Sequence, residues 1–72
     1  MIKMEGYLRG NFEGFNNYDT VFEFENGSKW QQDEYKYYYH YANRPKAKVI
    51  EENGRYFLEV KGLNSRVRVK RI

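Results

Sequence analysis

The sequence predicts an all-β fold, a small SH3-like or OB-like barrel of five to six short antiparallel strands joined by hairpins. Short runs rich in β-branched and aromatic residues recur along the chain, and Asn and Gly turn signals separate them. No stretch shows the apolar periodicity of a helix. The chain has 72 residues, which suffice for one core and not for two. We therefore expect residues 1–72 to form a single β-barrel domain.

The first half of the chain begins with a long predicted strand over residues 3–15. This strand is expected to bend or bulge at Gly10 or Gly14, because glycine inside a strand often marks such a site. A turn over residues 16–19 then leads to a second strand over residues 20–24, which is rich in β-branched and aromatic residues.

Two Asn-Gly pairs predict hairpins with type I′ turns, since that turn needs a positive φ at both central residues. Asn26-Gly27 is the first pair, and it leads to a return strand over residues 29–32. Asn53-Gly54 is the second, and it joins strands over residues 46–51 and 55–60. Both pairs therefore indicate antiparallel neighbours.

The rest of the chain is less regular. Residues 35–41 suit a strand because of their tyrosine content, and they also suit a surface excursion. Pro45 cannot donate a ladder hydrogen bond, so we place a turn or a strand entry at residues 43–45. Residues 61–65 turn the chain again, and residues 66–72 form the last predicted strand.

Aromatic side chains are expected to supply most of the stability. The chain has no cysteine and so no disulfide, whereas it has eight Tyr, five Phe and one Trp, each of which removes a large area from water when buried. Strand alternation then indicates which side chains face inward. The predicted core residues are Phe12, Phe22, Phe24, Trp30, Val49, Leu58, Val60, Val67 and Val69, with Ala47 as a companion.

Three segments of the chain follow the patterns G-x-F-x-G-F, D-T-x-F and N-G-x-x-W-x-Q, over residues 10–15, 19–22 and 26–32. With these motifs the chain resembles a group of small bacterial β-domain proteins that have no established activity. The resemblance extends to residues 35–41, to Arg44-Pro45 and to the terminal strand over residues 67–72. It implies a small β-barrel module and supplies no catalytic residue.

Charge is distributed unevenly between the two halves of the chain. Residues 1–35 carry three basic and seven acidic side chains, a net charge of −4, and residues 36–72 carry ten basic and three acidic side chains, a net charge of +7. Such asymmetry indicates an anionic partner for the second half. The alternative is that the two halves neutralise each other within the fold.

Tyrosines and basic residues occur together in the second half. On a strand, Tyr35, Tyr37, Tyr39 and Tyr41 would share one face, and only one face can be buried. Exposed rings beside cations are the combination that binds single-stranded nucleic acid, by stacking and by phosphate contacts. The predicted ligand-binding residues are Tyr37, Tyr39, Tyr41, Lys46, Lys48, Arg66, Arg68 and Lys70.

The same residues also allow other interpretations. The tyrosines could form a groove for an extended protein ligand, as in SH3 domains, or pack at the rim of the barrel with only their hydroxyl groups in water. The arginines and lysine of the last strand could pair with Glu51 or Glu59 across the sheet, or protect an edge strand from aggregation. A protein-interaction or self-associating module is therefore the alternative function.

No pattern in the sequence indicates catalysis. His40 is the only histidine, and the acidic pairs Asp33-Glu34 and Glu51-Glu52 lie beside turns, where adjacent strand residues point to opposite faces. Neither a P-loop nor a dinucleotide-binding glycine motif is present. We expect a binding module that is not an enzyme and that uses no metal or cofactor.

Location and assembly follow from composition alone. Residues 1–6 precede no apolar run of signal-peptide length, and no segment approaches the roughly 20 apolar residues of a membrane-spanning helix. The expectation is a cytoplasmic protein without a membrane partner, monomeric or weakly dimeric, whose partner is a nucleic acid, another polyanion or a protein.

Overall fold

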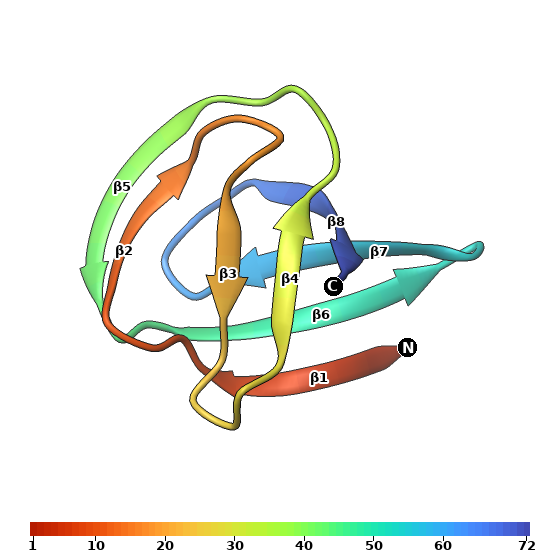
Figure 1. Ribbon diagram of the computed structural model, residues 1–72, viewed down its shortest axis with the longest axis horizontal. Coiled ribbons are helices and arrows are strands. Elements are labelled where there is room, and N and C mark those ends of the chain that lie inside the picture. Colours follow the sequence, from red (N-terminus) through yellow and green to blue (C-terminus); the bar gives the residue numbers. More distant parts are fainter.

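The computed structural model describes residues 1–72 and consists of eight strands and no helix (Figure 1). No helix long and apolar enough to cross a membrane is found. The strands are β1 (Ile2–Tyr7), β2 (Asn11–Phe15), β3 (Val21–Glu23), β4 (Lys29–Gln32), β5 (Tyr38–Asn43), β6 (Lys46–Glu52), β7 (Arg55–Val60) and β8 (Arg66–Arg71).

The strands form two antiparallel sheets. The larger sheet has six strands in the order β1-β6-β7-β8-β4-β3, and the smaller one pairs β2 with β5. An isolated bridge between Leu8 and Phe24 connects the chain just after β1 with the chain just after β3, which are the two edges of the larger sheet. The predicted all-β, antiparallel architecture is confirmed.

The number of strands differs from the prediction of five to six. The long strand expected over residues 3–15 is divided at Arg9 and Gly10, where Gly10 has a φ of 74°. The first part joins the larger sheet and the second part joins the smaller one. The tyrosine-rich segment also contains a strand, β5, which begins at Tyr38 and not at Tyr35. Residues 33–37 are irregular.

The two Asn-Gly hairpins turn differently. Asn53 and Gly54 have φ values of 53° and 79°, so the type I′ prediction is confirmed there. At the first hairpin only Gly27 has a positive φ, of 96°, so the type I′ prediction for Asn26 is wrong. The Phe24 N–H still donates to the Ser28 carbonyl at 2.9 Å, which leaves residues 25–27 as the loop, and the N–H of Gly27 donates to the Phe24 carbonyl at 2.9 Å. This combination is typical of a tight turn followed by a left-handed glycine.

Twelve apolar side chains form the buried core. All nine predicted core residues are among them, together with Ala47, Leu8 and Phe15. The rings of Phe12, Phe15 and Phe22 pack against one another with centroids 6.0 to 6.2 Å apart, which joins the smaller sheet to β3. The two sheets therefore share one core.

Gln32 is the only buried polar side chain of the core, and it is fully buried. Its amide group donates to the carbonyl oxygens of Glu34 and Lys36 at 2.9 and 2.8 Å. Its Oε1 accepts from the N–H of Asn16 at 3.0 Å. One side chain of β4 thus holds both the turn after β2 and the irregular segment before β5.

The smaller sheet contains an irregularity at Gly14. The β2–β5 register shifts between Phe12 and Gly14, and Gly14 has a φ of 100°. A Cβ atom added to Gly14 would lie 2.0 Å from the Tyr38 carbonyl oxygen and 2.8 Å from the His40 nitrogen. Only glycine allows β5 to approach β2 this closely.

The Gly14→Ala substitution should therefore cost about 2–5 kcal/mol in the free energy of unfolding, through the positive φ and the backbone clash together. Gly10→Ala is the matched control, because Gly10 also has a positive φ but nothing lies within 4 Å of its added Cβ. The control should cost only about 1–2 kcal/mol. Urea unfolding of both variants measures the difference, and equal costs would contradict the close approach of β5.

Candidate ligand-binding surfaces

The residues predicted to bind a ligand lie on both sheets. Tyr39 and Tyr41 belong to β5, and Tyr37 directly precedes it. Their exposed fractions are 64%, 54% and 70% respectively, so the expected exposed tyrosine face exists. The basic residues lie on β6 and β8 of the larger sheet. The structure therefore distributes the eight residues over two surfaces.

The tyrosine surface borders a groove of about 380 Å³ between β2 and β3. Tyr37 and Tyr39 line it, together with the three packed phenylalanines of the core and Val21 of β3. Glu13 is the only charged residue that lines it. We call this feature the tyrosine groove. Its lining contains no cation, so Tyr37 and Tyr39 share this groove with none of the basic residues that the sequence grouped with them.

His40 lies on the opposite face of β5 from Tyr39 and Tyr41. It is half-buried, and its Nε2 atom would lie 3.8 Å from a Cβ added to Gly62, in the loop between β7 and β8. No group of three or more His, Cys, Asp or Glu side chains lies close enough together to hold a metal ion.

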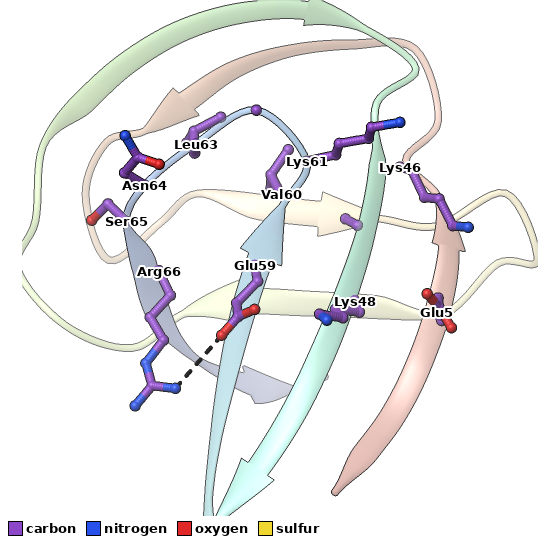
Figure 2. Close-up of a pocket in the computed structure, with 12 residues that line it drawn as sticks. Glu5, Lys46, Lys48, Glu59, Val60, Lys61, Leu63, Asn64, Ser65 and Arg66 are labelled. Carbon is purple, nitrogen blue, oxygen red and sulfur yellow. Dashed lines mark ion pairs between the residues drawn. The ribbon is translucent and has the colours of Figure 1, made fainter.

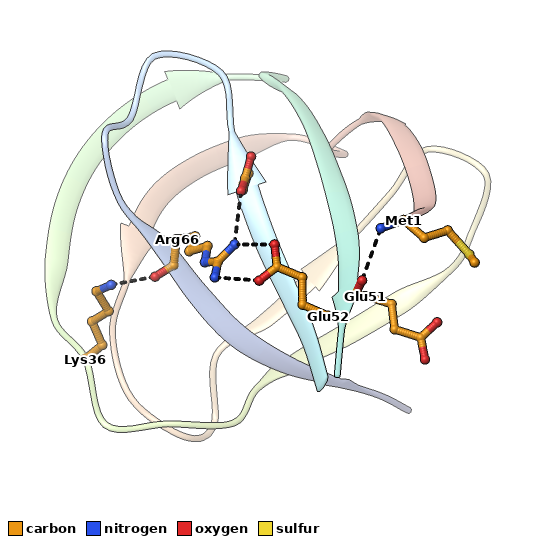
Figure 3. Close-up of polar contacts among 6 residues, drawn as sticks. Met1, Lys36, Glu51, Glu52 and Arg66 are labelled. Atoms are coloured by element: carbon orange, nitrogen blue, oxygen red, sulfur yellow. Dashed lines mark hydrogen bonds and ion pairs between the residues drawn. The ribbon is translucent and has the colours of Figure 1, made fainter. Parts of the chain in front are cut away.

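The arginines of β8 contact carboxylates of their own chain. The Arg66 guanidinium donates to both carboxylate oxygens of Glu52, at 2.9 and 3.2 Å, and lies 3.6 Å from Glu59 (Figure 3). It also lies over the Phe57 ring, 4.2 Å from its centroid. These contacts agree with the alternative of cross-strand pairing, except that Glu52 takes the place expected for Glu51. Glu51 contacts Lys3 instead, at 3.3 Å.

Arg68 is held in a similar way by the irregular segment before β5. Its Nε atom donates to the Asp33 carbonyl at 2.9 Å and lies 3.9 Å from the Asp33 carboxylate. Its backbone N–H donates to the Glu34 carboxylate at 2.7 Å. Lys36 of the same segment donates to the Arg66 carbonyl (Figure 3). Of the three basic residues predicted on β8, only Lys70 forms no ion pair.

The outer face of the larger sheet carries a row of alternating charges. The strand register places Glu5 of β1 opposite Lys48, Lys48 opposite Glu59, and Glu59 opposite Arg66. Opposite charges on directly paired residues of neighbouring strands attract each other. Arg66, at the end of the row, is therefore neutralised from two sides.

A second concave surface contains this row and extends to the loop between β7 and β8. It is a cleft of about 610 Å³, and Lys46, Lys48, Lys61 and Arg66 lie around it (Figure 2). Two carboxylates, Glu5 and Glu59, also line it, as do the polar Asn64 and Ser65 and the apolar Val60 and Leu63. We call it the cationic cleft, since four cations oppose two anions there.

Two lysines of the cationic cleft, Lys46 and Lys61, are exposed and have no carboxylate opposite them, whereas Lys48 is half-buried between Glu5 and Glu59. Lys46, Lys48 and Lys61 form no ion pair, whereas Arg66 does. Lys61 was not predicted, because it lies in a turn, and strand alternation cannot place a turn residue on a face. The only signal for Lys61 in the sequence is that it precedes a glycine, Gly62. In the structure Gly62 has a φ of 97° and reverses the chain towards β8.

More basic than acidic side chains remain without an ion pair in the folded molecule. Five of the thirteen basic side chains form ion pairs, and six of the ten acidic ones do. Three of the six pairs join the two halves of the chain: Lys3 with Glu51, Arg44 with Glu25, and Arg68 with Asp33. The halves therefore neutralise each other in part, and eight basic residues remain without a carboxylate partner.

Comparison of the chain with protein-family models, curated proteins and solved structures found no match. The resemblance to small bacterial β-domain proteins accordingly stays a prediction.

The bidentate pair of Arg66 and Glu52 changes the pKa values of both side chains. The Arg66 hydrogen bond, and then its charge, lowers the pKa of Glu52, and the same pair raises the pKa of Arg66. A carboxyl whose pKa is lowered by folding stabilises the fold above its unfolded pKa, and this contribution disappears as the pH falls through the folded value.

Arg66→Met should therefore return the pKa of Glu52 to the ordinary range for a glutamate, and should reduce stability at neutral pH but not at strongly acidic pH. A carbon-detected NMR titration of the Glu52 carboxyl measures the shift directly. The Glu13 carboxyl, which has no ion pair, serves as the internal control. An unchanged Glu52 titration in Arg66→Met would contradict the pairing.

Proposed function

We propose that the protein is a non-enzymatic binding module that holds single-stranded nucleic acid or another polyanion in the cationic cleft. One observation supports this proposal most strongly: Lys46 and Lys61 are exposed on one concave surface, beside the half-buried Lys48, and none of the three forms an ion pair. Lysines that share a cleft repel each other, and a bound polyanion removes that repulsion and releases its own counterions.

The shape of the cleft suits a charged chain more than a compact ligand. It is open, and its apolar lining is restricted to Ala47, Val60 and Leu63. Figure 2 shows Lys46 and Lys61 at one end of it and Lys48 between Glu5 and Glu59. Phosphate groups spaced along a strand can each meet one lysine in such a place. We expect binding without base specificity, at about micromolar affinity or weaker, because phosphate contacts read no sequence.

Tyr41 is the tyrosine that we assign to the polyanion. It is exposed on β5, it does not line the tyrosine groove, and β5 leads through Pro45 directly to Lys46. A nucleic-acid strand that leaves the cleft along β5 would stack one of its bases on the Tyr41 ring. Such stacking tolerates any base.

An SH3-like small barrel is the fold that we propose for this module. The Leu8–Phe24 bridge supports it, and so does the hydrogen bond from the Glu25 N–H to the Tyr7 carbonyl at 2.9 Å. Both contacts connect the edge strands of the larger sheet, as closure of a barrel requires.

The lysines of the cleft should determine the salt dependence of binding. For a thymidine oligonucleotide of about 15 nucleotides, the Lys46→Gln/Lys61→Gln variant should bind more weakly. Its plot of log affinity against log salt should be shallower by about 1.4, since each phosphate contact on single strands contributes about 0.7. Fluorescence anisotropy at several salt concentrations measures both quantities.

Lys29→Gln is the matched control for this experiment. Lys29 is also an exposed lysine without an ion pair, but it lies on β4 and outside the cleft. It should leave the salt slope nearly unchanged. The cleft is excluded as the binding surface if the control and the double variant lose affinity equally.

Tyr41→Ala should weaken oligonucleotide binding about tenfold, because one stacked base contributes about 1–3 kcal/mol. Tyr41→Phe should bind like the wild type, since the ring and not the hydroxyl makes the contact. Tyr35→Ala is the control, because Tyr35 is more exposed than Tyr41 but precedes β5. Affinity of Tyr41→Ala within twofold of the wild type would remove Tyr41 from the proposal.

A further inference from the structure

The tyrosine groove separates two strands that are consecutive in the chain and do not pair. β2 and β3 are joined by residues 16–20, yet β2 pairs only with β5, and β3 pairs only with β4 (Figure 1). At one end the Arg9 N–H still donates to the Glu23 carbonyl, at 2.8 Å. Beyond that contact the two strands are separated by the groove, which they line on both sides.

Both strands direct unpaired backbone groups towards this groove. The Gln32 N–H donates to the Thr20 carbonyl at 2.8 Å, and the Phe24 N–H donates to the Ser28 carbonyl at 2.9 Å. Because alternate residues of a strand direct their N–H and C=O groups to opposite sides, those of Val21 point away from β4. On β2, Gly10 accepts from Arg44 on the β5 side, so the backbone groups of Asn11 point towards the groove.

The side chains around the groove suit an extended peptide. Its lining combines three packed phenylalanines, the exposed Val21 and the rings of Tyr37 and Tyr39. A peptide added as a strand would direct alternate side chains towards this aromatic lining. The remaining side chains would point towards solvent at the border of the groove.

The charge of the groove indicates which peptide it would accept. Glu13 lines the groove, and Asp19 directly precedes Thr20, which also lines it. Both carboxylates are exposed, and both are without an ion pair. No lysine or arginine lines the groove. A basic side chain on the ligand would therefore find two free carboxylates and the electron-rich faces of the tyrosines.

We propose that the tyrosine groove binds an extended peptide of a partner protein, in which basic and apolar side chains alternate. The peptide adds as a strand to the free edge of β2 or β3, and its basic side chains contact Glu13 and Asp19. This site is separate from the cationic cleft, and the proposal does not depend on polyanion binding.

The segment of this chain that fits such a peptide best is not free to bind a second copy. The segment that best fits the pattern is β8, with the sequence Arg-Val-Arg-Val-Lys-Arg. It lies inside the larger sheet, where it pairs with both β7 and β4. Releasing it would require unfolding the core to which Val67 and Val69 belong. The occupant is accordingly a segment of another protein.

The test is an amide chemical-shift titration of the labelled protein with a blocked heptapeptide of alternating arginine and valine. Shifts should concentrate on β2, β3 and residues 37–39, and not on Lys46 or Lys61. A matched peptide with N-methylated backbone amides cannot pair as a strand, and should bind at least about tenfold more weakly. The alternating glutamate and valine peptide should not bind.

A variant of the protein tests the charge contacts. Glu13→Gln/Asp19→Asn should weaken the arginine peptide about tenfold, since each exposed charge contact contributes up to about 1 kcal/mol. Both residues are exposed, so the variant should unfold at nearly the wild-type urea concentration, and it should bind oligonucleotide as the wild type does.

Several outcomes would overturn the proposal. They are the absence of shifts at millimolar peptide, equal binding of the N-methylated peptide, shifts centred on the cationic cleft, and an unchanged affinity of the double variant. Concentration-dependent shifts of β2 and β3 without peptide would show that a second copy occupies the groove, and would also reject it. Shifts of the arginine peptide centred on the cationic cleft would also count against polyanion binding there. The other results do not bear on oligonucleotide binding, so failure of one proposal can be distinguished from failure of the other.

Discussion

The structure depends on the buried amide of Gln32. This side chain satisfies two carbonyl groups of the segment before β5 and one N–H of the turn after β2. The same segment reaches β8 through Lys36 and Asp33, which contact Arg66 and Arg68. A buried polar group that loses its partners costs about 1–3 kcal/mol, so this arrangement is strongly specified. It attaches the smaller sheet to the larger one and thereby determines where Tyr37 enters the groove. It also explains why the arginines of β8 are not free, since the same segment contacts them.

Two surfaces of opposite character result from this attachment. Carboxylates of the first half of the chain remain free beside the tyrosine groove, and lysines of the second half remain free around the cationic cleft. The arginines nearest the centre of the larger sheet contact carboxylates of their own chain, so they do not attract ligands to its outer face. The uneven charge of the sequence therefore appears in the fold as two separate surfaces and not as one basic patch. A module of this kind could hold an anionic chain and a basic peptide at the same time.

Strand alternation in the sequence was sufficient to predict the all-β class and nine core residues, because a half-buried strand has to alternate. The same alternation places Gln32 on the buried side with Trp30, but it was not among the predicted core residues because its side chain is polar. Local patterns could not show that β2 and β3 remain unpaired, since this depends on Gly14 bringing β5 against β2. Likewise, the contact between Arg66 and Glu52 depends on strand order and on the register set by the turn at Asn53. The grouping of Tyr37 and Tyr39 with basic residues was based on proximity in sequence. The chain changes from the smaller to the larger sheet at Pro45, and the groove that these two rings line contains no cation.

We propose that one small domain carries two independent binding surfaces. The most direct measurement is a chemical-shift titration in which the thymidine oligonucleotide is added first and the arginine–valine peptide second, at a salt concentration where the two ligands do not associate. We expect two sets of shifted amides that do not overlap, around Lys46 and Lys61 for the oligonucleotide and on β2 and β3 for the peptide, with the first set unchanged by the second ligand. Displacement of one ligand by the other from a shared set of residues would contradict the account.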